Sequence, residues 1–128
     1  MSVLVDTSIW IRFLSNRAPY ARELDDLLNR EDVRAHEFVY GELLIGDRSG
    51  RKKLLGDYEL MDHAPVVPHA DVAVFVRERS LQGRGIGWID AHLLASALVG
   101  GLRLWTADAA LGRVARDLDV AYETQGGA

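Results

Sequence analysis

The amino-acid sequence predicts one α/β domain, with a mostly parallel sheet of about five strands flanked by helices. Short apolar runs alternate with amphipathic helical stretches along the chain, which is typical of repeated strand–helix units. The length of 128 residues suits one domain and is short for two. Apolar residues make up 48% of the chain and charged residues 27%, the balance of a globular protein. We therefore expect a single domain over residues 1–128.

In the first half of the chain, apolar runs predict three strands and amphipathic stretches predict four helices. Pro19 opens the second helix, in which three leucines recur at helical spacing, and Pro68 closes the third strand. The expected elements in order are a strand over 2–5, a helix over 7–14, a helix from Pro19 that includes Leu28, a strand over 33–36, helices over 37–45 and 54–61, and a strand over 64–67.

The second half of the chain predicts three helices and two further strands, with glycines at several boundaries. The first helix stops at Gly83, a glycine-rich loop follows over 83–87, and Gly100 with Gly101 ends the second helix. That second helix carries almost no charge, so it should be buried. The expected elements are a helix through Val72, Val76 and Leu81, a helix over 90–99, a strand over 102–105, a helix over 109–118, a strand over 120–122, and a frayed, flexible tail over 125–128.

The composition excludes several classes of protein. No cysteine is present, so a thiol nucleophile, a zinc–thiolate site and a disulfide framework are excluded. The longest nearly apolar stretch, over 89–102, is too short to span a membrane and contains Asp90 and His92. The first five residues carry no basic side chain, so we expect no secretory signal and a cytoplasmic location.

The charge balance gives no clear indication of the partner. The chain has 19 acidic and 15 basic residues, a net charge of −4, which argues weakly against a nucleic-acid partner. All the basic residues except Lys52 and Lys53 are arginines, a residue type suited to bidentate phosphate recognition. A coding bias toward GC-rich codons explains the same excess, so charge alone does not identify the ligand.

Two aspartates directly follow apolar strands. Asp6 comes after the apolar run Val3–Val5, and Asp108 comes shortly after the strand over 102–105. In an open parallel sheet, ligands bind beyond the carboxyl ends of the strands. Both carboxylates should therefore lie at the ligand-binding edge of the sheet.

Two further carboxylates should reach the same edge. From Asp90 to Gly100 the expected helix descends about 15 Å, and the strand that follows climbs back about 16 Å. Asp90 should thus end level with Asp108. Glu42 lies in the second turn of the helix over 37–45, and its side chain leans toward the helix N-terminus and therefore toward this edge.

Each of these carboxylates also has a purely structural interpretation. Asp90 and Asp108 stand at helix starts, where aspartate is a favoured cap, Asp6 suits a turn, and Glu42 suits a partly buried glutamate with a satisfied partner. Four converging negative charges, however, raise one another's pKa and cost stability unless a cation or a function maintains them. An all-oxygen cluster suits a hard divalent ion such as Mg²⁺ or Mn²⁺.

Four segments around these acids resemble the PIN-domain ribonucleases, and most closely the VapC toxins of bacterial toxin–antitoxin pairs. The segments are Val3–Ser8, Val39–Leu43, Trp88–Ala95 and Leu104–Asp108. All four acidic positions occur in the order of the family, with a threonine two residues before the last. The resemblance covers the chain from Ser2 to about Tyr122.

The resemblance implies a Mg²⁺- or Mn²⁺-dependent endoribonuclease with one or two ions per site, which cleaves single-stranded or loop RNA and leaves a 3′-hydroxyl and a 5′-phosphate. It also implies a cognate VapB-like antitoxin, a homodimer, and no association with a membrane. Asp6, Asp90 and Asp108 would bind metal directly or through water. Glu42 would complete the metal shell, or position and deprotonate the attacking water.

Several nearby residues are candidates for supporting roles. Thr106 could hydrogen-bond a ligand carboxylate. Thr7 and Ser8, at a helix start, could steady a carboxylate or a substrate phosphate, and Thr7 suits a plain helix cap equally well. Arg84, in the glycine loop, is the best candidate for a phosphate contact. His92 points to a different side of its helix from Asp90 and is expected to be structural.

Other functions stay open at this point. Aspartyl-phosphate hydrolases also place acids at strand ends, but their second acidic position is occupied here by Ser8. A non-catalytic module that docks an arginine of a partner in its acidic pocket is a further alternative, and metal binding would distinguish it. An apolar groove for an antitoxin peptide is expected from Trp10, Phe13 and Leu14 beside Leu43 and Leu44, which suit a core equally well.

Overall fold

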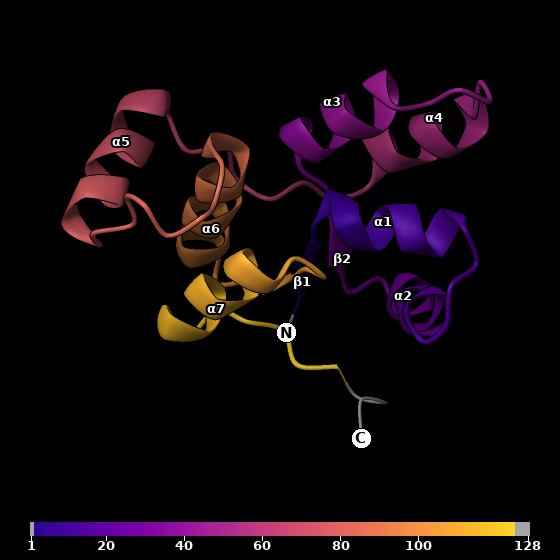
Figure 1. The fold of residues 1–128 in the computed structure, drawn as a ribbon. Helices are drawn as coiled ribbons and strands as arrows, with labels where there is room; N and C mark the ends of the chain where they lie inside the picture. Colours follow the sequence, from indigo (N-terminus) through magenta and orange to yellow (C-terminus); the bar gives the residue numbers. More distant parts are fainter. Residues whose placement is uncertain (1, 125–128) are drawn as a thin grey trace.

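The computed structural model describes residues 2–124 and has the α/β architecture predicted from the sequence (Figure 1). The tail expected over 125–128 lies outside the described residues. In chain order the elements are β1 Val3–Val5, α1 Thr7–Leu14, α2 Tyr20–Asn29, β2 Val33–Arg34, α3 Glu37–Ile45, α4 Lys52–Leu60, α5 His69–Glu78, α6 Trp88–Gly100, β3 Arg103–Trp105 and α7 Ala109–Asp117.

The sheet is parallel, and β1 is its central strand. The order of strands is β2-β1-β3, with Val3 opposite Val33 on one side and Val5 opposite Trp105 on the other. All three residues of β1 are buried. A strand that is covered on both faces is expected to be apolar throughout, which explains the continuous run of valine and leucine at the start of the sequence.

Two of the five expected strands form only single bridges. Instead of the strand expected over 64–67, the structure has a single bridge between His63, just before this segment, and Ala35, just after β2. Pro65 and Pro68 have no N–H group to donate, so the ladder cannot continue through this segment. The segment expected over 120–122 bridges only through Ala121 and Leu104, because it is a short stretch after the turn that ends α7.

Three helix boundaries also differ from those expected by two residues or more. Helix α4 starts at Lys52 rather than 54, and α6 starts at Trp88 rather than 90, with Gly87 in the capping position. Helix α5 ends at Glu78, before the expected stop at Gly83. The reason is local: Ser80 has a φ of 54°, a left-handed conformation that ends a helix.

The helices cover the strands from two sides. Figure 1 shows α1 to α4 on one side of the strands and α5 to α7 on the other. Helix α6 is buried from Ala91 to Ala97, as expected for a helix with almost no charged residue. Its leucines pack in the core with apolar residues from α1, α2 and α7, among them Ile9, Leu24 and Leu111. Among residues 2–124, no helix is both long and apolar enough to cross a membrane.

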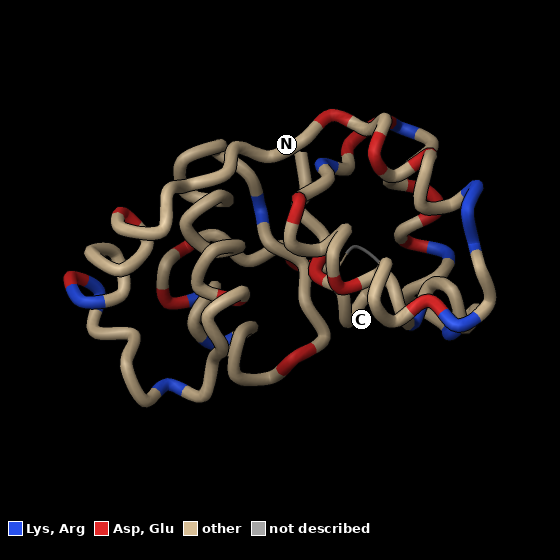
Figure 2. Tube along the Cα trace, turned by 90° about the horizontal axis from the view of Figure 1, so that it is seen from above, with Lys and Arg blue, Asp and Glu red and all other residues tan. Residues whose placement is uncertain are grey.

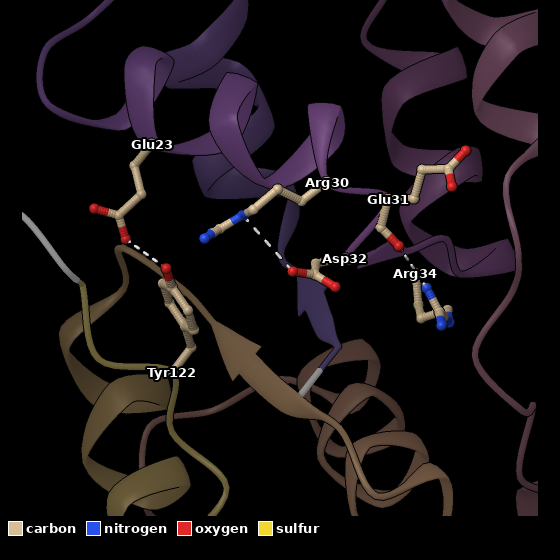
Figure 3. A network of polar contacts seen from close by, with 6 residues as sticks. All are labelled: Glu23, Arg30, Glu31, Asp32, Arg34 and Tyr122. Atoms are coloured by element: carbon tan, nitrogen blue, oxygen red, sulfur yellow. Dashed lines mark hydrogen bonds and ion pairs between the residues drawn. The ribbon is translucent and has the colours of Figure 1, made fainter.

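Polar contacts tie the last described segment to α2 (Figure 3). The Tyr122 hydroxyl donates a 2.7 Å hydrogen bond to Oε2 of Glu23, and burial raises the pKa of Tyr122, with this bond adding to the effect. Nearby, Arg30 Nε lies 3.7 Å from Oδ2 of Asp32. Because Asp32 immediately precedes β2, this ion pair marks the amino end of the strands, opposite to the edge at which the candidate site lies.

Candidate active site at the carboxyl edge of the sheet

Four carboxylates from four parts of the chain surround the carboxyl edge of the sheet. Asp6 follows β1 and Asp108 follows β3, each in the capping position of the next helix. Asp90 lies in the first turn of α6, and Glu42 lies within α3. Figure 2 views this edge from above, and acidic segments from several parts of the chain lie near the middle of the view.

The strand register explains why the first and last of these acids are neighbours. Val5 lies opposite Trp105 in the parallel ladder, and the Asp6 N–H donates a 2.9 Å hydrogen bond to the Trp105 carbonyl. The chain therefore leaves the sheet at Asp6 and at Thr106 side by side. Asp6, directly after β1, thus lies beside Thr106, directly after β3.

The Asp6 carboxylate is buried and held by two hydroxyl groups. Asp6 is only 6% exposed, and its Oδ2 atom accepts 2.7 Å hydrogen bonds from both Ser8 Oγ and Thr106 Oγ1. Each hydroxyl in turn accepts a 3.0 Å bond from a backbone N–H, Ser8 from Ala107 and Thr106 from Asp108. These bonds join the start of α1 to the turn after β3 and fix the direction of the carboxylate.

Asp90 interacts with the other three carboxylates through their charges. Burial raises the pKa of Asp90, the hydrogen bond from the Gly87 N–H opposes that effect, and the charges of Asp6, Asp108 and Glu42 raise the pKa further. The Gly87 N–H lies 3.0 Å from Oδ2 of Asp90 and so completes the cap of α6. Asp90 is therefore close enough to each of the other three acids for their charges to repel its own.

Asp108 combines a structural contact with an exposed position. Its Oδ2 atom accepts a 2.8 Å hydrogen bond from the Leu111 N–H, which caps α7. The side chain is exposed, in contrast to that of Asp6. The cap expected from the sequence is therefore present, and it engages one of the two carboxylate oxygens.

Glu42 is held by a residue of α1. The Thr7 hydroxyl donates a 2.6 Å hydrogen bond to Oε1 of Glu42, across 35 positions of the sequence. The capping position of α1 is occupied by Asp6, so the Thr7 side chain steadies a carboxylate instead of capping the helix. The hydrogen bond fixes one oxygen of Glu42 next to the start of α1.

A buried histidine, which the sequence analysis did not single out, anchors the helix that carries Glu42. His36 caps α3: its Nδ1 accepts a 3.0 Å bond from the Phe38 N–H, and its Nε2 lies 3.0 Å from Oγ of Ser96 in α6. Burial lowers the pKa of His36 to about 4, with the charges of His92 and His63 adding to the shift. Histidine is not among the preferred helix caps, so its position directly before Glu37 gave little signal.

Arg84, the candidate for a phosphate contact, forms an ion pair with α7. Its Nη2 atom is 2.6 Å from Oδ2 of Asp117, at the last residue of α7. Asp108 stands at the other end of that helix, about 13 Å away along the axis. The role of Arg84 in phosphate binding stays a prediction.

The donor set can be compared with the needs of a divalent cation. All four candidate ligands are carboxylates, the donor type that Mg²⁺ and Mn²⁺ prefer. Across residues 2–124, no three acidic or histidine side chains form a group that could hold a metal ion as they lie. One oxygen each of Asp90 and Asp108 is bound to a helix start. The donors fit a hard cation in chemistry, and side-chain rotation would be needed to bring three of them onto one ion.

An apolar groove opens beside Thr7 and Glu42, between α1, α3 and α4. Its volume is about 240 Å³, and its apolar lining includes Ile11, Leu14 and Leu43. Trp10, expected to line such a groove, is instead a core residue that is 2% exposed. Helical phase explains the difference, because neighbouring positions of α1 point in different directions.

Comparisons with known proteins agree with the fold. Residues 3–117 match the family model described as the PIN domain. Two curated relatives, both named Ribonuclease VapC32 and both from Mycobacterium tuberculosis (strains CDC 1551 / Oshkosh and ATCC 25618 / H37Rv), are each 46% identical to this chain over 107 residues. These alignments cover 83% of this chain and 84% of each relative.

A solved structure supports the fold. The crystal structure of PAE2754 from Pyrobaculum aerophilum superposes with a TM-score of 0.55 at 19% sequence identity, covering 88% of this chain and 78% of that chain. At this identity the likeness shows the fold alone. The family match and the identity to the curated relatives both span most of the sequence, so this chain belongs to the PIN-domain family and is of the VapC type.

Proposed function

We propose that this chain is an endoribonuclease toxin that hydrolyses single-stranded or loop RNA at the carboxylate edge and thereby inhibits translation or growth. One observation carries the proposal: in this VapC-type chain, Asp6 and Asp108 directly follow the adjacent strands β1 and β3, and their charges and that of Glu42 act on Asp90. The name of the relatives, ribonuclease, supports the same chemistry.

The proposed reaction depends on Mg²⁺ or Mn²⁺. Asp6, Asp90 and Asp108 would hold one or two ions, directly or through water. A bound ion lowers the pKa of a water molecule and offsets the negative charge on the phosphate and the leaving oxygen. Binding of a cation would also relieve the repulsion that the four carboxylates exert on one another.

The protein's own residues would orient the site. The hydroxyls of Ser8 and Thr106 hold Oδ2 of Asp6 and thereby direct its other oxygen, Oδ1. Thr7 holds Oε1 of Glu42, so Oε2 is the atom that would accept a proton from the attacking water. Hydrolysis in this sense breaks the bond between phosphorus and the 3′-oxygen, and leaves a 3′-hydroxyl and a 5′-phosphate.

The proposal includes a VapB-like antitoxin, a homodimer and a cytoplasmic location. A basic side chain of the antitoxin would bind the carboxylate cluster, since charge-assisted hydrogen bonds to buried carboxylates are strong. The groove beside Thr7 and Glu42 would receive apolar side chains of the same segment. Its proximity to both residues would let one bound peptide block the site.

Expression in a bacterial host tests the proposal. Induction of the chain should arrest growth, and RNA from those cells should carry new ends with 5′-phosphates and 3′-hydroxyls. Asp90→Asn, which can still accept the Gly87 hydrogen bond, should do neither. Normal growth and intact RNA in cells that contain the folded wild-type protein would contradict the proposed function.

A further inference from the structure

Trp88 is a large aromatic side chain that is exposed beside the candidate site. It is the first residue of α6, two positions before Asp90, and 42% of it is accessible to solvent. The other two tryptophans, Trp10 and Trp105, are core residues that are each 2% exposed. A half-exposed tryptophan two residues before one of the candidate acids is not explained by core packing alone.

Neighbouring rings hold the Trp88 side chain in place. The ring of His92 packs edge-on against it, with centroids 5.0 Å apart and an interplanar angle of 86°, and the ring of His69 lies at 4.9 Å. Phe38 of α3 packs edge-on against His92 at 4.7 Å. Because His92 is only 3% exposed, Trp88 rests on a buried base. A ring held in one orientation loses little further freedom when a planar ligand stacks on it.

The aromatic rings connect α6 to α3, the helix that carries Glu42. Trp88 and His92 are four residues apart and share one face of α6, whereas Asp90 projects from another side. On α3, Phe38 and Glu42 are likewise four residues apart. Phe38 and Glu42 therefore share one face of α3, and the rings of Phe38, His92 and Trp88 connect that face to the start of α6. A ligand that bridges Glu42 and Trp88 has a charged part and a planar part.

We propose that Trp88 provides a stacking surface for an unpaired nucleobase of the RNA, adjacent to the phosphate that is cleaved. This inference rests on the proposed function. Every base has a π face, and stacking on aromatic side chains is the common way in which proteins bind unpaired RNA bases. Stacking needs no positive charge on the protein, which suits a chain with a net charge of −4. It also favours single strands, because the faces of bases in a duplex are already covered.

Tryptophan fluorescence measures the proposed contact directly. The wild-type protein in EDTA is titrated with three 12-nucleotide probes: single-stranded RNA, the same RNA in a duplex, and a single-stranded chain of abasic nucleotides. The integrity of each probe is checked on a gel after the titration. Because Trp10 and Trp105 are buried, quenching would report on Trp88. We expect saturable quenching by the single-stranded RNA and little by the duplex or the abasic chain.

Variants separate stacking from a structural role. Trp88→Ala should weaken binding of the single-stranded RNA, measured by anisotropy of a labelled probe, and raise KM in cleavage, each by about tenfold with a smaller change in kcat. Trp88→Phe, which keeps a ring, should stay within about threefold of wild type. Val99→Ala is the matched control, since Val99 is 69% exposed on the same helix, about 16 Å from Trp88 along the axis.

The outcomes distinguish this inference from the proposed function. If wild type cleaves RNA and Trp88→Ala, folded by its melting curve, binds and cleaves like Val99→Ala, the stacking role is wrong and the proposed function stands. Equal quenching by the abasic chain would also overturn it. Emission that changes with protein concentration before RNA is added would mean that a second copy of the chain covers Trp88, which contradicts a free stacking surface. Failure of wild type to cleave any RNA would overturn the proposed function itself.

Discussion

The hydroxyl of Thr106 donates a 2.7 Å hydrogen bond to Oδ2 of Asp6, two residues that are 100 positions apart in the sequence. The same hydroxyl accepts a 3.0 Å bond from the Asp108 N–H. One side chain thus connects the acids that follow the two adjacent strands β1 and β3. This hydroxyl group therefore orients the Asp6 carboxylate and holds the backbone at Asp108.

Removal of that hydroxyl should impair activity. Thr106→Val keeps the size of the side chain but leaves Oδ2 of Asp6 with one partner fewer and the Asp108 N–H without one. We expect the rate of RNA cleavage to fall by about 10- to 100-fold and the free energy of unfolding to fall by about 1–3 kcal/mol. Thr106→Ser retains the hydroxyl and should stay close to wild type in both measurements. Equal rates for the valine and serine variants would show that the hydroxyl does not orient the site.

Glu42→Gln tests the role of the glutamate that Thr7 holds. Glutamine can still accept the Thr7 hydrogen bond, so the fold should be retained, but it cannot take a proton from water. We expect kcat for RNA cleavage to fall by about 100-fold or more. Glu37→Gln, an exposed residue in the first turn of the same helix, is the matched control and should cleave normally. A Glu42→Gln enzyme with normal kcat would remove Glu42 from the reaction.

Repulsion at the acidic edge predicts that removing a charge does not destabilise the metal-free protein. Burial and the three neighbouring charges raise the pKa of Asp90, so its ionised form is disfavoured in the folded state. In EDTA at neutral pH, the Tm of Asp90→Asn should equal or exceed that of wild type. Asp71→Asn, also in the first turn of a helix, should lower Tm slightly, because it loses only a favourable interaction with the helix dipole. A lower Tm for Asp90→Asn than for Asp71→Asn would mean that the four charges do not repel.

The lowered pKa of His36 predicts that the protein loses stability in mild acid. The unfolded chain takes up a proton at this residue near pH 6.5, whereas the folded protein resists protonation until about pH 4. The contribution of His36 is therefore fully present above pH 6.5 and is lost as the pH falls toward 4, by about 3 kcal/mol in total. The pKa of His92 is also lowered by burial, which acts in the same direction.

Denaturant unfolding at several pH values measures this effect. His36→Asn keeps a side chain that can cap α3 but does not titrate in this range. It should be less stable than wild type at pH 7.5, since it loses packing and the contact with Ser96, and it should lose less stability between pH 6.5 and 4. An equally steep pH dependence in the variant would assign the effect to other groups.

The sequence predicted the position of the acids better than it predicted the edges of the sheet. Strand–helix alternation places Asp6 and Asp108 at one edge on any parallel topology, and helix and strand lengths bring Asp90 to the same level. Two segments at the edges of the sheet were predicted as strands but form only single bridges. An apolar run such as 64–67 has the same hydrophobic pattern whether or not a neighbouring strand pairs with it. The prolines on either side of that run were the better guide.

Contacts between distant side chains were not predictable in the same way. The sequence suggests a hydroxyl partner for a carboxylate, but only the register of β1 and β3 selects Thr106 for Asp6. The pairing of Arg84 with Asp117 shows the opposite case, in which a residue near the site in sequence turns to another partner. His36 was overlooked because a buried, neutral histidine has no characteristic spacing.

The central claim is that the carboxylate edge cleaves RNA with a divalent metal ion. Its most direct test is the cleavage rate of one single-stranded RNA with Mg²⁺, with Mn²⁺ and with EDTA, for wild type, Asp108→Asn and Asp117→Asn. The last two variants remove a carboxylate from opposite ends of α7, and asparagine caps a helix nearly as well as aspartate. We predict metal-dependent cleavage by wild type and Asp117→Asn, none in EDTA, and a rate at least about 100-fold lower for Asp108→Asn. Equal cleavage in EDTA, or equal rates for the two variants, would contradict the claim.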